Sequence, residues 1–305
     1  MHLRQLEYLV ILDRDRHFGN AARNCGISQS ALSQALRSIE DEFGVPIVLR
    51  GNQGFQGFTP EGQRILEWAR GLLADRKTLL QQIAGSDPGS LSGHLQLGVI
   101  PVATPMVSLI TTPLQKLYPG ITIKLQSQTG AQILRGLERF EIEAGITYVD
   151  HAGDSNVRPY VLYEESYYLL APETHAIASQ SAITWREAAS LPLCLLSPEM
   201  LNRHLLDGIF QSAGVAPATV IDTDCAMVLC SHVRSGEWFT IVPHSFFYLI
   251  SGWAGTKPLP IVEPVARNMM GLLIAERQPM PPLINALVEC VQALDISKEL
   301  AKYVA

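Results

Sequence analysis

AARNCGISQSALSQALRSIEDEFGVPIVLR, residues 21–50, decides the fold of the front part of this chain. Ala21 and Ala22 are small enough to let two helices approach closely, and Gly26 interrupts the chain after them. Ser28 is of a residue type that caps helix N-termini, so a new helix is expected to begin there. A helix, a tight turn with glycine and a second helix, in this order, predict a helix-turn-helix.

The helix that follows Ser28 has one apolar and one polar face. Apolar residues recur at helical spacing and predict one continuous buried stripe, made of Leu32, Leu36, Ile39 and Phe43. The opposite face carries amides, hydroxyls and one guanidinium, on Gln29, Ser30, Ser33, Gln34 and Arg37. Amides and hydroxyls bond to base edges without burying a charge, so this face is a candidate for reading a major groove.

The flanking segments complete a small domain over residues 1–58. Residues 3–13 have apolar side chains at helical spacing and predict a first helix. Gly44 and Pro46 are expected to end the helix that follows Ser28, and the segment VPIVLRGNQGFQGFT at 45–59 predicts two short strands about a glycine-rich turn. This hairpin would be the wing of a winged helix-turn-helix, with Arg50 placed for a phosphate contact.

Residues 59–88 predict a long linker helix followed by a hinge. Thr59 suits an N-cap and Pro60 the first helical position, and the helical pattern runs to about Ala84. Apolar side chains in steps of three and four favour a coiled-coil dimer, with Arg76 as the polar exception in a seam of Leu66, Ala69, Leu73, Leu80 and Ile83. The alternative is an amphipathic helix packed on its own domain. The turn formers of GSDPGSLSG, 85–93, indicate the hinge.

Residues 89–305 alternate strand-like and helical segments, which predicts an α/β fold with mostly parallel sheets. The pattern restarts near Glu165, and a further strand and helix follow Pro264. We therefore expect two lobes, lobe I at about 89–164 and 265–305 and lobe II at about 165–264. A chain that crosses twice between lobes makes a hinge with a cleft.

Composition limits the class of protein. No apolar run in the 305 residues reaches the roughly 18 that a membrane span needs, so we expect a cytoplasmic protein without membrane contact. The net charge is −6, and residues 1–58 hold six basic and six acidic side chains. Nonspecific attraction to DNA should therefore be weak, and affinity must come from several domains bound at once. Five cysteines without C-x-x-C spacing argue against a disulfide framework or a zinc ribbon.

The sequence resembles the LysR-type transcriptional regulators over essentially its whole length. The resemblance rests on LRQLEYLV at 3–10, on residues 21–50 and on TPEG at 59–62, and more loosely on GHLQLGVIP, YPGITIKLQ and VRSGEWFTIVP. It implies a winged helix-turn-helix, a dimerising linker helix and a two-lobed effector domain like the periplasmic binding proteins. The implied partners are double-stranded DNA at a pseudo-palindromic promoter site, a second copy of the chain in dimers and in tetramers, and RNA polymerase.

The effector cleft is expected to hold a small anion. Thr104-Pro105 and Ser197-Pro198 each have the chemistry of a helix start, and two helix N-termini facing one cleft favour negative charge. The resemblance places both segments at the family's cleft. The candidate residues of lobe I are Pro101, Val102, Ala103, Thr104, Gln128, Thr129, Gly130 and Thr147. Those of lobe II are Ser197, Pro198, Glu199, Met200, Arg203, Pro243 and His244. Arg203 either clamps a carboxylate or is a solvated helix residue.

Two alternatives remain open. One keeps the fold but makes cysteine oxidation the signal, as in the peroxide-sensing member of the family. The segment that resembles that member's reactive region, LLSPEMLNRHLLD at 195–207, holds no cysteine. The other is an enzyme that pairs Cys194 or Cys230 with His204, His232 or His244, which no spacing supports. Neither a cofactor nor a metal is expected, because His244 has no acidic or histidine partner at a supporting spacing.

Overall fold

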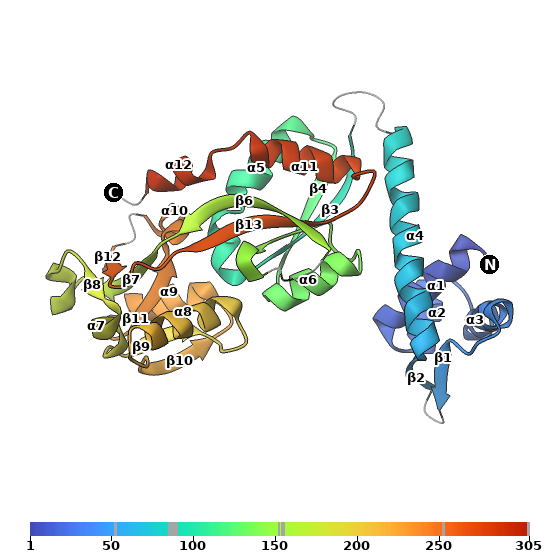
Figure 1. Ribbon diagram of the computed structural model, residues 1–305, viewed down its shortest axis with the longest axis horizontal. Coiled ribbons are helices and arrows are strands. Elements are labelled where there is room, and N and C mark those ends of the chain that lie inside the picture. The colour runs from blue at the N-terminus through green and yellow to red at the C-terminus, as the bar shows by residue number, and fades with distance from the viewer. Residues whose placement is uncertain (52–53, 85–90, 152, 154–155, 252–253, 304–305) are drawn as a thin grey trace. The chain divides into compact units, whose positions relative to one another are not determined.

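The computed structural model describes residues 1–51, 54–84, 91–151, 153, 156–251 and 254–303. The chain divides into two compact units, residues 1–86 and 87–305 (Figure 1). Each unit is described by itself. Most of the expected hinge at 85–93 lies outside the described residues.

The first unit begins with three helices, α1 (Leu3–Asp15), α2 (Phe18–Asn24) and α3 (Gln29–Phe43). The Ser28 hydroxyl accepts the Ala31 N–H at 3.1 Å and caps α3. Three of the four apolar residues expected inside, Leu32, Leu36 and Ile39, are fully buried. Phe43 is 43% exposed, because α3 ends there and its last side chain lies beyond the core. The helix-turn-helix is confirmed.

The wing is an antiparallel hairpin of β1 (Val48–Gly51) and β2 (Gly54–Phe58), as expected. The carboxylate of Glu40, on α3, accepts the N–H groups of Ile47 and Val48 at 3.0 and 3.2 Å. This side chain therefore fixes the start of the wing to the helix before it.

The linker helix α4 (Pro60–Ala84) is capped by Thr59, whose hydroxyl accepts the Gly62 N–H at 2.9 Å. The expected coiled-coil seam is wrong in its first half, because Leu66 and Ala69 are fully buried in the core of the first unit. Further along the helix, Leu79, Leu80 and Ile83 are more than half exposed. The helix thus packs on its own domain first and exposes apolar side chains later.

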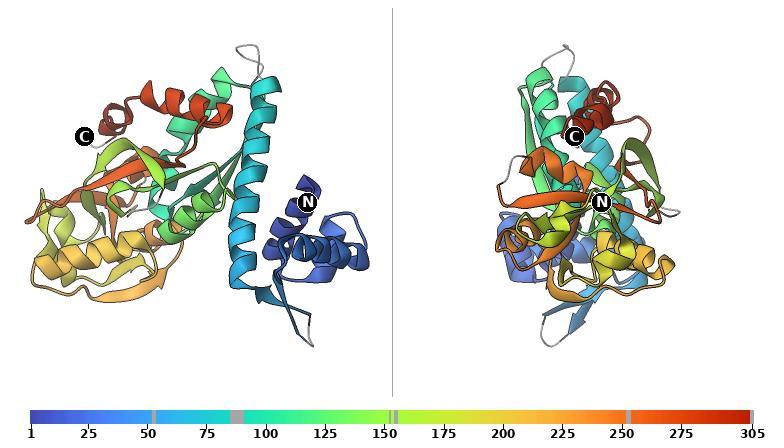
Figure 2. Two further views of the ribbon diagram at one scale, coloured as in Figure 1. Left: turned by 45° about the vertical axis from the view of Figure 1, so that its right-hand side comes forward. Right: turned by 90° about the vertical axis from the view of Figure 1, so that its left-hand side faces the viewer.

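Lobe I is built on a five-stranded sheet in the order β4-β3-β5-β13-β6. Its strands are β3 (Gly93–Val99), β4 (Ile121–Ser127), β5 (Ala144–Tyr148), β6 (Val157–Glu165) and β13 (Asn268–Ala275). α11 (Pro282–Gln292) packs beside α5 (Ser108–Leu117), and α6 (Gly130–Glu138) packs against β3, β5 and β13 (Figures 1 and 2). α12 (Ile296–Ala301) contacts β6. The C-terminal segment therefore completes the first sheet.

Lobe II is built on a six-stranded sheet in the order β10-β9-β11-β7-β12-β8. Its strands are β7 (Tyr167–Pro172), β8 (Ile183–Thr184), β9 (Leu193–Leu196), β10 (Thr219–Thr223), β11 (Phe239–Pro243) and β12 (Thr256–Val262). Its helices are α7 (Trp185–Ala189), α8 (Leu201–Ser212), α9 (Ala226–Arg234) and α10 (Phe247–Ile250). Short 3₁₀ helices are η1 (Pro101–Met106), η2 (Val149–His151), η3 (Ala176–Ser179) and η4 (His244–Phe246).

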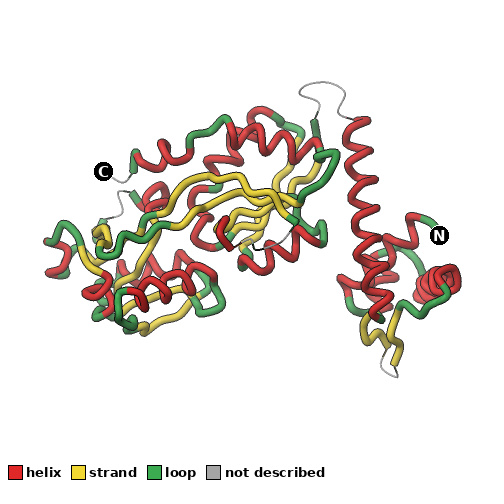
Figure 3. The backbone as a smooth tube through the Cα atoms, viewed as in Figure 1, coloured by secondary structure: helices red, strands yellow, loops and turns green. Residues whose placement is uncertain are grey.

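The sheets are mixed, not mostly parallel. β3 runs parallel to β4 and β5, whereas β13 is antiparallel to both β5 and β6. β7 is likewise antiparallel to both β11 and β12. These antiparallel strands lie next to the two places where the chain passes between the sheets, at Ser166 and between Val262 and Asn268. Figure 3 shows β6 and β13 side by side as two long strands. Two α/β lobes are confirmed.

Candidate DNA-reading face and effector pocket

The candidate DNA-reading residues of α3 lie on its outer face. Gln29, Ser30, Gln34 and Arg37 are exposed and Ser33 is half-buried. The Ser30 hydroxyl lies 2.9 Å from that of Ser28, which already caps the helix, so part of its bonding capacity is used. The other side chains present two amides, a hydroxyl and a guanidinium within three helical turns.

Arg50 on β1 is less available than expected for a phosphate contact. Its Nη2 lies 2.9 Å from a carboxylate oxygen of Glu40, and its side chain is 37% exposed. Because Glu40 also holds the wing, part of the Arg50 charge is neutralised within the protein.

Within the second unit, a cavity of about 260 Å³ lies between the lobes. Lobe I contributes the start of α6, the end of β5 and His151, and lobe II contributes the approach to α8 and its first turn. The lining residues are Thr129, Gly130, Ala131, Leu134, Thr147, His151, Glu199, Leu201 and His204. Four of the expected effector residues, Thr129, Gly130, Thr147 and Glu199, therefore line one pocket.

The lobe I wall of the pocket is formed by a helix N-terminus and a buried hydroxyl. Thr129 and Gln132 form a reciprocal capping box at the start of α6, with bonds of 2.8 and 3.2 Å. The remaining first-turn N–H groups give this end of the helix partial positive charge. Thr147 is 2% exposed, and its Oγ1 has no hydrogen-bond partner among the described residues. A polar ligand in the pocket can satisfy that oxygen.

Both expected helix starts at Thr-Pro and Ser-Pro are wrong. η1 begins at Pro101 with Ile100 as its N-cap, and the Thr104 hydroxyl donates to the Pro101 carbonyl at 2.7 Å. α8 begins at Leu201 with Met200 as its N-cap. Ser197 lies in a turn in which its carbonyl accepts the Met200 N–H, and Pro198 is exposed in the same turn. Neither hydroxyl caps a helix that faces the pocket.

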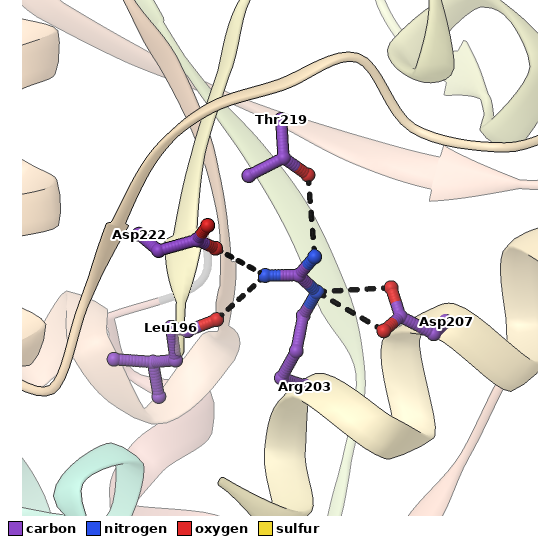
Figure 4. A network of polar contacts seen from close by, with 5 residues as sticks. All are labelled: Leu196, Arg203, Asp207, Thr219 and Asp222. Carbon is purple, nitrogen blue, oxygen red and sulfur yellow. Dashed lines mark hydrogen bonds and ion pairs between the residues drawn. The ribbon is translucent and has the colours of Figure 1, made fainter. Parts of the chain in front are cut away.

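Arg203 does not offer its guanidinium to a ligand. Its Nε donates to Asp207 at 3.0 and 3.1 Å, and its Nη1 donates to Asp222 at 2.5 Å and to the Leu196 carbonyl at 2.8 Å (Figure 4). The side chain is 11% exposed. Arg203 therefore does not bind a carboxylate ligand as expected, and its internal hydrogen bonds hold α8 against β9 and β10.

The remaining candidates pack between the lobes and do not line the pocket. Pro101, Val102 and Ala103 are buried in η1, which contacts η4 of lobe II, and Pro243 and His244 stand at the start of η4. His244 Nδ1 accepts the Ser166 N–H at 3.2 Å, and burial lowers the pKa of this histidine. Gln128 is half-buried just before Thr129 and does not line the pocket, although its Oε1 is buried without a partner among the described residues.

The sequence reasoning missed five lining residues: Ala131, Leu134, His151, Leu201 and His204. Leu201 of lobe II lies close to Gly130 of lobe I. A Cβ added at Gly130 would lie 3.2 Å from Leu201 Cδ2 and 3.4 Å from Thr147 Oγ1. A glycine opening a helix beside a strand end was the only signal of this contact in the sequence.

The interior cysteines are poor nucleophiles. Burial raises the pKa of the Cys194 thiol and of the Cys230 thiol to about 11, and it also raises the pKa of Cys290 and Cys25. Cys225, before the first turn of α9, is exposed. A Cys/His enzyme built on Cys194 or Cys230 therefore lacks a thiolate near neutral pH.

The described residues contain no cluster of three or more His, Cys, Asp or Glu side chains arranged to hold a metal ion. None of their helices has the length and apolar character for crossing a membrane.

Comparison with protein families settles the class. Residues 3–63 match the bacterial regulatory helix-turn-helix protein of the lysR family, and residues 88–295 match the LysR substrate binding domain. The chain belongs to the LysR family of transcriptional regulators. The members of this family are DNA-binding regulators and not enzymes, so the Cys/His enzyme alternative is wrong.

Individual LysR relatives align over nearly the whole chain. The DNA-binding transcriptional dual regulator OxyR of Escherichia coli K12 is 27% identical over 294 residues, which are 96% of this chain and 95% of OxyR. A hydrogen peroxide-inducible genes activator of Pectobacterium carotovorum is 26% identical over 293 residues, 96% of each chain.

Solved structures share the fold of this LysR protein. A full-length OxyR variant of Pseudomonas aeruginosa superposes with a TM-score of 0.77 at 22% identity, covering 98% of this chain and 97% of its own. Full-length CbnR in complex with its target DNA superposes with a TM-score of 0.64 at 19% identity, covering 96% and 99%.

Proposed function

We propose that this LysR-type regulator reads operator DNA with α3, and that a chemical signal received by the effector domain changes that binding. The observation that carries the DNA contact is the exposed polar face of α3 behind a capped turn. Gln29, Ser33 and Gln34 are proposed to contact base edges, Ser30 a base edge or phosphate, and Arg37 and Arg50 phosphates. Arg50 would have to leave Glu40 at least in part to do so.

Self-association is proposed to supply the affinity that one neutral domain lacks. The exposed apolar side chains Leu79, Leu80 and Ile83 on α4 are the surface proposed for the dimer contact. A dimer places two copies of α3 on a pseudo-palindromic site, and a dimer of dimers places four. The protein is proposed to act in the cytoplasm, where promoter DNA and RNA polymerase are found.

Oxidation of a cysteine is the signal that the relatives' names favour. Thiolates and not thiols react with oxidants, so a buried cysteine with a raised pKa is a poor sensor. The burial of each cysteine in this chain therefore narrows the choice. Cys194, Cys230 and Cys290 are buried with raised pKa values, and Cys25 is half-buried. Cys225 is exposed beside the N-terminus of α9, so it is the cysteine that we assign to this role.

A small polar effector is the second candidate signal. It is favoured by the 260 Å³ pocket and by the unpartnered Oγ1 of Thr147 inside it. The α6 N-terminus, His151 and His204 suit a small anion, while the Glu199 carboxylate requires that the charge lie toward α6.

One experiment separates the two signals. Binding of the full chain to the DNA upstream of its own gene is measured before and after hydrogen peroxide, for the wild type and Cys225→Ser. Oxidation sensing predicts a peroxide-dependent change that reducing agent reverses and that Cys225→Ser abolishes. An unchanged complex in the wild type would exclude it and leave the pocket as the receiver.

A further inference from the structure

Glu165 stands at the joint between the two lobes. It is the last residue of β6, and Tyr167 begins β7 in lobe II one residue beyond Ser166. Asn268, where the chain returns to lobe I, pairs with Glu165 in the register of β13 and β6. Both passages of the chain between the sheets therefore meet at this carboxyl group, which is completely buried.

A hydrogen-bond network from both lobes ends on this carboxyl group. Its Oε2 accepts from the Tyr148 hydroxyl at 2.8 Å and from the Tyr167 hydroxyl at 3.3 Å. The Asn202 amide, on α8, donates to Tyr148 at 2.9 Å, and the Asn268 amide donates to Tyr167 at 2.7 Å. Lobe I supplies Tyr148 and Asn268, and lobe II supplies Tyr167 and Asn202.

On balance, the surroundings of Glu165 disfavour a negative charge. No basic side chain of the described residues pairs with it, and its Oε1 has no hydrogen-bond partner among them. Arg267, the residue before β13, pairs with Glu164 at 3.3 Å, where both side chains are half exposed. Burial outweighs the two tyrosine hydrogen bonds and raises the pKa of Glu165 to about 8.

Two more titratable groups lie close by. Tyr163, on β6, is buried, and burial raises its pKa far above the neutral range. The ring of His244, on η4, packs edge-on against Tyr163 at 5.5 Å between centroids. Tyr148 and Tyr167 also have raised pKa values, so the tyrosines stay neutral near pH 7, and Glu165 and His244 are the titratable groups that remain.

We propose that Glu165 is a proton-operated lock between the lobes. In the arrangement described here the carboxyl group carries its proton and the network holds the lobes together as neutral hydrogen bonds. When the lobes turn apart, water reaches the group, the O–H bond breaks, and the proton passes to water while the electron pair stays on the carboxylate. Lobe movement and proton release are then one coupled step. This inference is independent of which signal the effector domain receives.

The coupling has a definite sign. Because the folded pKa of Glu165 is raised from 4.5 to about 8, the protein binds a proton that the unfolded chain releases between those values. The stabilisation of the folded protein that comes from the raised pKa of Glu165 is fully present below pH 4.5 and is lost as pH rises to about 8. His244, whose pKa is lowered from 6.5, acts oppositely, and its stability is lost as pH falls below 6.5. The effect of Glu165 is therefore isolated between about pH 6.5 and 8.

The test compares the full chain with Glu165→Gln, which is neutral at every pH, and with Glu164→Gln, the same change at the exposed neighbour. The wild-type melting temperature is expected to fall by roughly 3 °C for each pH unit from 6.5 to 8 relative to Glu165→Gln. Glu164→Gln is expected to follow the wild type. Equal slopes for Glu165→Gln and the wild type would overturn the proposal.

If the Glu165→Gln variant does not fold, a second measurement on the wild type tests the proposal. The wild type is expected to show the infrared carbonyl band of a protonated carboxylic acid at pH 7, which disappears near pH 8. Tyr148→Phe removes a hydrogen bond that favours the carboxylate and should move that midpoint to higher pH. Amide exchange at Ser166 and Tyr167, corrected for its intrinsic pH dependence, should rise in the wild type across the same midpoint. Absence of the band, or an amide exchange rate that does not change across the midpoint, would contradict the lock.

Discussion

The side-chain amide of Asn202, on α8, donates a 2.9 Å hydrogen bond to the hydroxyl of Tyr148, the last residue of β5. Each of these residues follows a lining residue of the pocket, since Leu201 precedes Asn202 and Thr147 precedes Tyr148. A change in the distance between α8 and β5 at the pocket therefore also changes this hydrogen bond. The pocket and the buried joint of the lobes are adjacent parts of one structure.

Asn202→Leu should loosen that connection while keeping the branched shape of the side chain. Asn202 is 4% exposed and Tyr148 keeps its bond to Glu165, so we expect a loss of about 1 kcal/mol in the free energy of unfolding. Urea unfolding of the full chain measures it. An unchanged free energy of unfolding would show that the bond contributes nothing across the lobes.

Gly130→Ala should narrow the pocket, because the added methyl group would lie 3.2 Å from Leu201 Cδ2. Acetate, phosphate and sulfate serve as probes, and any rise in melting temperature that one of them gives the wild type should shrink in the variant. Gly208→Ala on α8 is the matched control, since its Cβ would meet nothing within 4 Å. Equal shifts in both variants would place the ligand elsewhere.

Arg203→Met should destabilise the second unit by about 1–2 kcal/mol, because Asp207, Asp222 and the Leu196 carbonyl lose a shared donor. The figure is modest because the two aspartates are 42% and 49% exposed. Arg135→Met, at an exposed position of α6, should be neutral in the same urea titration. If Arg203→Met were as stable as the wild type, the hydrogen bonds of Arg203 would not hold α8 against β9 and β10.

Leu80→Asp should separate the oligomer, because it places a charge in the apolar surface proposed for the dimer contact of α4. Gln82→Asp adds the same charge at an exposed polar position on the same helix and should leave assembly intact. Sedimentation velocity distinguishes the two. A Leu80→Asp protein that sediments like the wild type would exclude this part of α4 from the interface.

The front of the molecule was predictable from sequence because its signals are local. Ser28, Thr59 and the turn at Gly44 act on residues within one helical turn, and each lies where it was expected. The prediction of a coiled-coil seam along the linker helix was wrong in its first half because of tertiary packing. Spacing shows that Leu66 and Ala69 are on one face, but the core of the same domain covers that face.

The pocket was only partly predictable. Thr129 is followed by Gln132 in a capping box, a pattern visible in sequence, and it does open a helix at the pocket. Thr104 and Ser197 carry the same residue chemistry, but the Thr104 hydroxyl donates to the Pro101 carbonyl, and the Ser197 carbonyl accepts the Met200 N–H in a turn before α8. Strand β12 contains Pro258 and Pro260, which contradict a strand pattern, so its sequence does not predict it. Arg203 was misassigned because only the fold of lobe II brings Asp222 to it.

The most direct measurement of the proposed function is the affinity of the full chain and of Gln29→Ala for the DNA upstream of its own gene and for random DNA of equal length. Base readout by α3 predicts that Gln29→Ala loses roughly 1–3 kcal/mol on the first DNA and almost nothing on the second. Arg37→Ala, a phosphate contact, should weaken both and flatten the salt dependence. A wild type that binds the two DNAs equally, or a Gln29→Ala loss of equal size on both, would contradict sequence-specific reading by this helix.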